Sequence, residues 1–317
     1  MNDSKFQNRR DFLKFSLGLS ASICGLSVSS QDLFLFKKGI TKLTILYTND
    51  THSRIEPFPE NDTKYAGEGG FAKRAELIDQ IRKQEAHVLL LDAGDIFQGT
   101  PYFNYYQGEV EYKLMSLMDY DATTFGNHDF DLGCENILKQ MPHANFDFIN
   151  CNYNLDNTAL SKNKKITPYK IYKKGQLKIG VLGVGIELEN LVDKKYAKDI
   201  IYNDPIFNAN KIASHLRNEE KCDYVICLSH LGYQYDGNKI SDIVLGKQSR
   251  NIDFIIGGHT HTFLDTPKCV KNLDGKEVNI TQVGWGGIWL GRIEIYFAHN
   301  NEKYLQNTSN HKIQGSK

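Results

Sequence analysis

The chain has 317 residues, which is enough for one large domain or two small ones with a sizeable buried core. Its 38 basic and 38 acidic residues cancel, so no overall field attracts nucleic acid or an anionic membrane surface. Nucleic acid is therefore not expected as a partner. Any anionic ligand must be held by local groups instead.

The first 30 residues differ from the rest of the chain. Arg9 and Arg10 precede a modestly apolar stretch from Phe15 to Ser29, and this arrangement resembles a twin-arginine export signal. The stretch is short and interrupted by serines, so no stable membrane span is expected. We expect a signal over residues 1–30 and export to the periplasm or the extracellular space; a basic cap on an ordinary helix is the alternative.

From Lys42 onward, short apolar runs alternate with segments of helical spacing, which is typical of one α/β domain. We assign this domain to residues 40–299 and expect a polar tail over 300–317. Predicted helices cover residues 71–84, 110–118, 132–141 and 205–216, the last with Asp204 as its cap. Predicted strands cover residues 43–47, 88–91, 122–125, 146–149, 170–172, 177–184, 224–228, 254–256, 278–283 and 290–297.

Five of the strand-like runs end in polar side chains that bear carboxylate, amide or imidazole groups. In an open α/β sheet, ligands bind beyond the carboxyl ends of the strands, so a common sheet edge would bring these groups together. A lone Asp or His after a strand is more often a turn residue, but five such coincidences favour a site. The residues are Asp50 and His52, Asp95, Asn127 and His128, His230, and His259 and His261.

This mixture of ligand types suits borderline divalent ions such as zinc, manganese, iron or cobalt. Two such ions about 3.5–4 Å apart can hold both an attacking water and phosphoryl oxygens. In Asp50-x-His52, alternate residues of an extended segment lie on one side, so both can face one ion. In His259-x-His261 the same spacing fits either one ion or two neighbouring ions.

Taken in chain order, these motifs resemble those of the calcineurin-like metallophosphoesterases. The segments 45–52 and 126–131 narrow the resemblance to the 5'-nucleotidase branch, and it extends over about residues 43–297. It implies a four-layer α/β/β/α sandwich, in which two mixed sheets are flanked by helices. The motifs are Asp50-x-His52, Gly94-Asp95, Gly126-Asn127-His128-Asp129, His230 and Gly258-His259-Thr260-His261.

The resemblance also implies a role for each side chain. Asp95 would bridge two divalent ions, zinc, manganese or similar. The first ion would be held by Asp50, His52, Asp95 and His261, and the second by Asp95, Asn127, His230 and His259.

The same resemblance makes His128 and Asp131 the catalytic pair. His128 would stabilise the transition state or protonate the leaving oxygen, and Asp131 would orient His128 and raise its basicity. Asp129 is then expected at a turn or behind the ligands, and Asp92 is expected to be structural.

The implied activity is hydrolysis of nucleoside 5'-monophosphates to nucleoside and phosphate by an exported enzyme. Two-domain 5'-nucleotidases carry a second domain with aromatic rings and arginines for the substrate, and the resemblance does not reach that far. Either a separate chain of that C-terminal type supplies the clamp, or the enzyme acts alone with loose selectivity, with loops 98–106 and 284–289 as sources of local aromatic surface. Alternative substrates for the same site are cyclic nucleotides, nucleotide-sugar diphosphates and sulfur esters. The alternative role is that of a binding subunit whose active domain lies on a partner chain.

Overall fold

The computed structural model describes residues 39–237, 239–298 and 303–314. The expected export signal over residues 1–30 lies outside this part of the chain. Among the described residues, no helix has both the length and the apolarity needed to cross a membrane.

One mixed sheet has seven strands. The last five strands in its order run parallel to one another, while the first two, at one edge, are each antiparallel to the next strand. Their order is β15 (Lys303–Lys312), β14 (Trp289–Phe297), β1 (Thr41–Thr48), β2 (Val88–Asp92), β3 (Ala122–Thr123), β4 (Asp147–Ile149) and β6 (Ile166–Thr167).

A second mixed sheet has six strands, of which the four central ones are parallel and the two edge strands antiparallel. Their order is β12 (Lys268–Lys271), β13 (Glu277–Thr281), β11 (Phe254–Gly257), β10 (Tyr224–His230), β8 (Leu177–Gly185) and β7 (Tyr169–Lys174). A small antiparallel pair joins β5 (Tyr153–Asn154) to β9 (Ile201–Tyr202).

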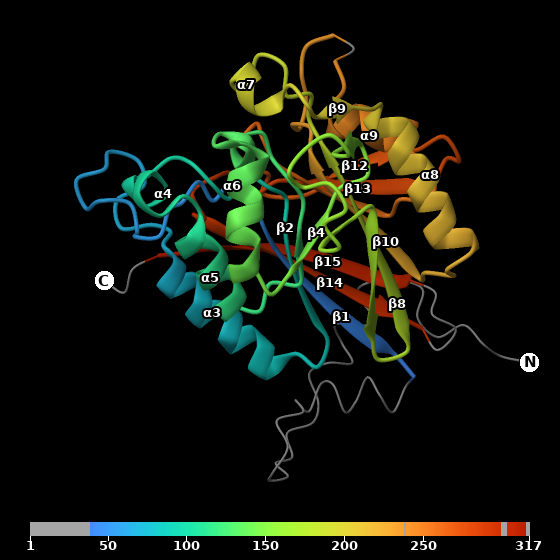
Figure 1. Cartoon of the computed structure of the whole chain (residues 1–317). Helices are drawn as coiled ribbons and strands as arrows, with labels where there is room; N and C mark the ends of the chain where they lie inside the picture. Colours follow the sequence, from blue (N-terminus) through green and yellow to red (C-terminus); the bar gives the residue numbers. More distant parts are fainter. Residues whose placement is uncertain (1–38, 238, 299–302, 315–317) are drawn as a thin grey trace, which may run out of the picture.

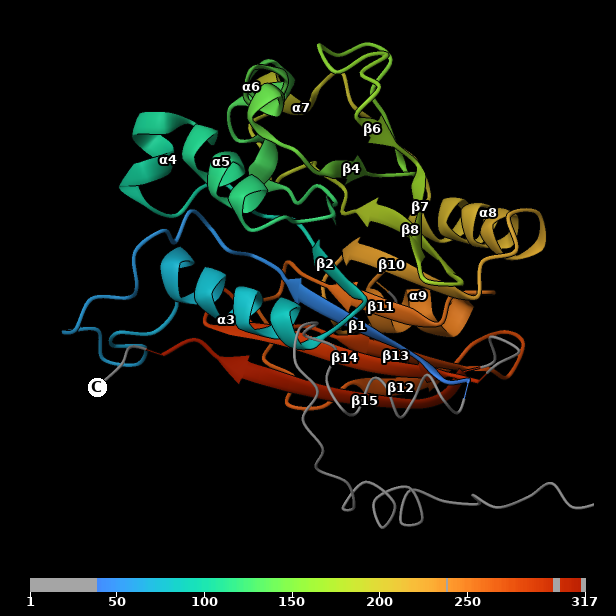
Figure 2. The same cartoon turned by 90° about the horizontal axis from the view of Figure 1, so that it is seen from below.

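Helices cover the outer faces of both sheets. In Figure 1, α3, α5 and α6 lie on one side of the sheets and α8 and α9 lie on the other, and Figure 2 shows the same layers from below. The helices are α3 (Phe71–Gln84), α4 (Pro101–Tyr106), α5 (Glu109–Leu117), α6 (Gly133–Gln140), α7 (Lys194–Ala197), α8 (Pro205–Asn218) and α9 (Asp242–Gln248). Two short 3₁₀ turns are η1 (His128–Phe130) and η2 (Met141–His143).

The alternation of side chains along each strand explains why there are four layers. In β1, Leu43 and Ile45 lie in the core between the sheets, whereas Leu46 packs in the core under α3 and α5. In β10, Ile226 faces the shared interior, whereas Val225 packs toward α8 and α9. Successive side chains point to opposite faces of a sheet, so continuous apolar runs bury both faces. The predicted α/β/β/α sandwich is confirmed.

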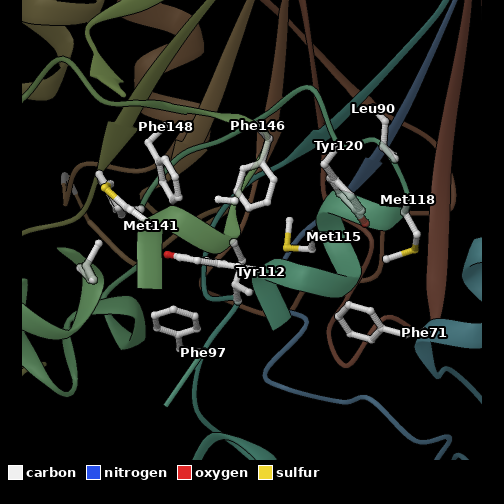
Figure 3. Close-up of a cluster of buried hydrophobic side chains, with 14 of the residues drawn as sticks. Phe71, Leu90, Phe97, Tyr112, Met115, Met118, Tyr120, Met141, Phe146 and Phe148 are labelled. Atoms are coloured by element: carbon white, nitrogen blue, oxygen red, sulfur yellow. The ribbon is translucent and has the colours of Figure 1, made fainter. Parts of the chain in front are cut away.

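The core under the first helical layer also anchors a loop of the site. Figure 3 shows Tyr112 of α5 between Phe97 on one side and Phe146 and Phe148 on the other, with ring centroids 4.8, 5.6 and 5.4 Å apart respectively. Phe97 follows β2 and is completely buried. Because Phe97 is only two residues after Asp95, this aromatic packing fixes the loop that carries the Asp95 carboxylate.

The polar tail expected over residues 300–317 is wrong for residues 303–312, which form β15. This strand pairs antiparallel with β14 along nearly its whole length. The backbone ladder of an edge strand needs no apolar side chains, and polar edge strands avoid pairing with other molecules. Ile313, just after the strand, is 2% exposed and joins the core under α3.

Several other elements depart from the sequence expectations. The two late strands predicted over 278–283 and 290–297 do exist as β13 and β14, but they belong to different sheets. The segment between them therefore crosses from one sheet to the other. The helices α4 and α9 and the strand β12 were not predicted, because each is short.

Candidate metal centre

The predicted site residues lie at or just after the carboxyl ends of parallel strands, but these strands come from both sheets. The loops after β1, β2 and β3 belong to the seven-stranded sheet, and those after β10 and β11 belong to the six-stranded sheet. Backbone N–H of His259 donates to Asp50 Oδ1 at 2.9 Å across this junction. The site therefore lies where the ends of two stacked sheets meet, and not along a single sheet edge.

Two groups of potential metal ligands occur in the described part of the chain. In each, the ligand atoms all lie within 4.8 Å of one another. The groups are Asp50, His52 and His261, and Asp95, His230 and His259.

The first group is compact. His52 Nε2 lies 3.0 Å from His261 Nε2, and His261 Nε2 lies 3.4 Å from Asp50 Oδ1. The carboxylate of Asp95 is also near, because its Oδ2 lies 3.8 Å from His52 Nε2. These four side chains therefore lie close to one another.

The second group adjoins the first. Asp95 Oδ2 lies 3.1 Å from His230 Nε2, and His259 Nδ1 lies 2.8 Å from Asn127 Oδ1. Asp95 thus faces an imidazole of each group, as a bridging carboxylate would. Asp50 Oδ1 also reaches both groups, at 3.9 Å from His52 Nε2 and 3.8 Å from His230 Nε2.

The orientation of His230 fits a cation between these groups. The Nδ1 atom lies 2.7 Å from the carbonyl oxygen of Ala93, which can only accept, so Nδ1 carries the hydrogen and donates. In the neutral imidazole, Nε2 then carries a lone pair that faces Asp95 Oδ2 without a hydrogen bond, in a completely buried position. Two buried acceptors facing each other are unfavourable unless a proton or a cation lies between them. Nitrogen and carboxylate donors aimed at one point suit a divalent ion.

The pKa values show the same need for positive charge. Burial opposes a charged imidazole, but Asp95 and Asp50 outweigh it and raise the pKa of His230 to about 10. Burial likewise opposes ionisation of Asp95, yet His230 and His52 lower the pKa of that carboxyl. By contrast, burial and the neighbouring His230 lower the pKa of His259 to about 4, which keeps the His259 imidazole neutral and able to bind a metal.

The backbone is strained at five of the candidate ligands. Left-handed φ angles occur at Asp50 (48°), His52 (47°), Asp95 (55°), His259 (74°) and His261 (52°). Such angles are uncommon outside glycine and cluster at functional sites. The expectation of an extended segment at Asp50-x-His52 is therefore wrong, although both side chains do face the same group. The spacing of His259-x-His261 fits either one ion or two, and in the structure the two imidazoles lie in different groups of potential ligands.

Glycines allow the loops to approach this closely. A Cβ atom added to Gly126 would overlap Asp95 Oδ1, and one added to Gly94 would lie 2.5 Å from Gly126 N. Gly94 also has a φ of 88°. The glycines next to the candidate ligands thus keep the Asp95 and Asn127 loops in contact.

His128 and Asp131 form a pair at the margin of the two groups. His128 Nδ1 lies 2.8 Å from Asp131 Oδ2, which makes Nε2 the nitrogen available to a substrate. Burial opposes the charged imidazole, but Asp131 and Asp95 raise the pKa of His128 above its ordinary value. The His128 ring also meets the edge of the His52 ring, with centroids 5.4 Å apart.

Two further carboxylates lie behind the site. Asp129 accepts hydrogen bonds from four backbone N–H groups, those of Asp95, Ile96, Phe97 and Gly126, and so joins the loops after β2 and β3. Asp92 accepts from Thr48 Oγ1 at 2.6 Å and from Gly94 N at 2.9 Å. Both residues are buried and hold backbone in place.

Sequence reasoning did not identify two buried amides that support the site. Asn49 accepts from Val283 N and donates to the carbonyl oxygen of Gly284, so it ties the segment before Asp50 to the sheet crossing. Gln282 contacts the segment that carries His259. A polar residue inside an apolar run was the available signal for Gln282, since it falls within the predicted strand 278–283.

The loops expected to offer aromatic surface do carry aromatic side chains. Trp285 is half-buried and stacks on His261, with ring centroids 5.6 Å and planes 9° apart. On α4, Tyr105 is 80% exposed and Tyr106 is 42% exposed. Trp285 therefore lies directly beside a candidate ligand.

Comparison with known proteins agrees with this geometry. A family model for the calcineurin-like phosphoesterases matches residues 43–263. The chain therefore belongs to the calcineurin-like phosphoesterase family, and it is a metallophosphoesterase-type hydrolase. The predicted family is confirmed.

Within this family the chain is similar to 5'-nucleotidases. It is 33% identical over 277 residues to snake venom 5'-nucleotidase of Gloydius brevicauda, with 82% of this chain and 46% of that protein covered. It is 34% identical over 269 residues to 5'-nucleotidase of Vibrio cholerae, with 81% and 47% covered. The crystal structure of a 5'-nucleotidase precursor from Thermus thermophilus superimposes with a TM-score of 0.78 at 28% identity, covering 86% of this chain and 55% of that one. The chain thus spans about half the length of these relatives.

Proposed function

We propose that this chain is an exported, dinuclear metal-dependent phosphatase that hydrolyses nucleoside 5'-monophosphates to nucleoside and phosphate. The observation that carries the proposal is the pair of adjoining ligand groups with Asp95 between them. The nucleotide part of the proposal is supported by the names of the relatives, which are 5'-nucleotidases.

We assign the metal ligands as predicted from the sequence. Asp50, His52, Asp95 and His261 would hold one divalent ion, zinc, manganese or similar, and Asp95, Asn127, His230 and His259 would hold the other. The chemistry that a pair of such ions supplies is activation of water at neutral pH and neutralisation of phosphoryl charge.

The catalytic work of the side chains falls to His128. Its raised pKa favours the protonated imidazole, whose Nε2–H can donate to a phosphoryl oxygen or to the leaving oxygen of the ester. Asp131 holds Nδ1–H and so fixes the direction of the ring. The His128 backbone N–H donates to Asp95 Oδ1 at 2.8 Å, which ties the catalytic residue to the carboxylate that would be shared by the two ions.

Export and a partner chain are further parts of the proposal. The twin-arginine pattern at Arg9 and Arg10 supports export to the periplasm or the extracellular space. The relatives are about twice as long as the matched region, and we propose a domain of the C-terminal 5'-nucleotidase type, on a separate chain, as a contributor to substrate selection.

Phosphate release by the purified chain tests the function. We would compare AMP with UDP-glucose, a cyclic nucleotide and an aryl phosphate, before and after chelation and after return of zinc or manganese. We expect AMP to be the best substrate, with activity lost on chelation and restored by metal. Full AMP hydrolysis without bound metal would contradict the mechanism. Faster hydrolysis of another ester would show that nucleoside 5'-monophosphates are not the preferred substrates.

A further inference from the structure

Gln282 is a buried amide that lies directly after β13, behind the segment that carries His259 and His261. Its side chain is completely buried, and it is not one of the candidate ligands. A buried amide must have its hydrogen-bonding groups satisfied, so its partners show what it holds in place.

The partners of Gln282 are alternate residues of that segment. Its Oε1 accepts from Thr262 N at 2.8 Å and from Thr260 Oγ1 at 3.1 Å. Its Nε2 donates to the carbonyl oxygen of Gly258 at 2.5 Å. One side chain therefore fixes three positions of the segment from one side.

The two residues between these positions are His259 and His261. Each imidazole joins a different group of candidate ligands, His259 with Asp95 and His230, and His261 with Asp50 and His52. Both histidines have left-handed φ angles, which are unfavourable outside glycine and persist only when the surroundings impose them. Gln282 forms hydrogen bonds with the residues before and after each of these two histidines in the chain.

The hydrogen bonds of Gln282 continue toward a third imidazole. Its Nε2 lies 3.5 Å from Asp242 Oδ2, and the other oxygen of Asp242 accepts from Ser229 Oγ at 2.5 Å. Ser229 is adjacent to His230 in β10. The network behind the site therefore links the backbone of all three histidines contributed by the second sheet.

We propose that Gln282 is a positioning residue that fixes the spacing between the two halves of the metal centre, so that binding of the two ions is coupled through it. This inference rests on the proposed dinuclear function. A purely structural amide would contribute to folding in the same way whether or not metal is bound. A positioning amide changes the affinity for the ions, and outer partners of ligands typically change metal affinity about 10–100-fold.

The test uses the full chain, stripped of metal with a chelator, and Mn²⁺ as the probe. Gln282→Leu is close in size and removes the three hydrogen bonds to the segment 258–262 and the one to Asp242. Gln282→Glu keeps an acceptor for Thr260 and Thr262 but places an oxygen against the Gly258 carbonyl. The matched control is Gln140→Leu, since Gln140 is an equally buried amide of α6 that donates to Asn136 Oδ1 away from the site.

Mn²⁺ binding is measured by calorimetry, the metal-induced rise in Tm by thermal unfolding, and pairing of the ions by the spin-coupled Mn²⁺ signal. We expect wild type and Gln140→Leu to bind two ions with a coupled signal. Gln282→Leu should bind at least one ion about 10-fold or more weakly, lose the coupled signal and gain less Tm from metal. Gln282→Glu should show an intermediate loss.

Retention of two tightly bound, coupled ions by Gln282→Leu would overturn the positioning role while leaving the phosphatase proposal intact. Fewer than two ions in the wild type would overturn both. If Gln282→Leu does not fold, the comparison of Gln282→Glu with Gln140→Leu decides the matter by the same criteria, because Gln282→Glu retains part of the network.

Discussion

The candidate ligands are held in a state that is unfavourable without positive charge. His230 is completely buried, donates from Nδ1 to a carbonyl oxygen and turns its other nitrogen toward a carboxylate. Such an arrangement destabilises the folded state, and a bound cation would stabilise it.

Replacement of His230 by Ala should abolish most of the phosphatase activity. The change removes a ligand from the second group and leaves Asp95 without its nearest imidazole, so we expect a loss of more than about 100-fold, beyond that typical for outer partners. Metal analysis should find fewer than two ions per chain. His143→Ala, in η2, is the control, and unchanged activity of His230→Ala would show that this imidazole binds no catalytic ion.

Replacement of Asp131 by Asn should lower kcat by about 10–100-fold, because the His128 ring loses the carboxylate that fixes its direction and its charge. KM and metal content should change little, since Asp131 is not in either ligand group. Steady-state kinetics with AMP and metal analysis measure both. The exposed Asp156→Asn is the matched control, and a rise in KM at constant kcat would assign Asp131 to substrate binding instead.

At the scale of elements, a cluster of four charges joins β1, α3 and β14 at the end of the sheet remote from the site. Lys42 Nζ contacts Glu85 and Glu294 at 2.7 and 3.0 Å, and Arg292 Nη2 contacts the same two carboxylates at 2.5 and 2.6 Å. The cluster ties the loop after α3 to two neighbouring strands. It contributes to stability and not to the chemistry of the site.

Replacement of Glu294 by Gln should destabilise the protein at neutral pH and not at acid pH. Burial opposes ionisation of Glu294, but Lys42 and Arg292 outweigh it and lower the pKa of the carboxyl. A lowered carboxyl pKa stabilises the fold above the ordinary value of about 4.3, and this stability is lost as pH falls through the lower folded value. We expect a loss of about 1–2 kcal/mol at pH 7, between the values for exposed and buried pairs.

The measurement for this variant is denaturant unfolding at several pH values. The difference in free energy of unfolding between wild type and Glu294→Gln should stay constant from pH 7 to about pH 5 and shrink as the pH falls below the ordinary carboxyl pKa of about 4.3. Exposed Glu189→Gln should show no such trend. A difference independent of pH would mean that the charge of Glu294 does not contribute.

At the scale of the whole molecule, the site exists only where the two sheets meet. Asp50 and His259 are 209 positions apart in the chain, yet the backbone N–H of His259 contacts both oxygens of Asp50. The crossing between β13 and β14 completes the junction, since Gly286 N donates to Asp50 O at 2.7 Å. Stability of the sheet stack and geometry of the site are therefore linked through this crossing.

Truncation after residue 302 should destabilise the whole domain, because it removes β15 and exposes the long edge of β14. It also uncovers the hydrophobic core that Ile313 closes. We expect a clear fall in Tm and a lower yield of folded protein. Truncation after residue 314 is the control, and equal Tm values for the two truncated chains would show that β15 contributes nothing to stability.

Much of the fold was predictable where the local pattern is strong. The helix expected over residues 71–84 has those same bounds as α3, since its apolar residues recur at helical spacing. The cap of α8 was also predicted, and Asp204 Oδ1 accepts from Phe207 N at 2.9 Å. In contrast, β15 has no apolar alternation and forms because β14 offers it a free backbone edge, which no local pattern encodes.

The site was predictable to a similar degree and for a related reason. A carboxylate or imidazole at the end of a buried strand is visible in the sequence, and the nine predicted side chains lie at the strand ends and in the loops where the two sheets meet. Asn49 and Gln282 were missed because their roles consist of contacts with segments distant in the chain. The left-handed backbone at Asp50 and His52 was missed as well, because it follows from packing against neighbouring loops.

The sequence by itself determined which strands are buried, which polar groups follow them and to which family the motifs point, because these depend on residue type and short-range spacing. Only the tertiary structure decided that the strand ends come from two stacked sheets, that the backbone at Asp50 and His52 is left-handed, and that a buried amide supports His259 and His261 from behind. These features arise from contacts between residues far apart in the chain, whose energies no local pattern contains.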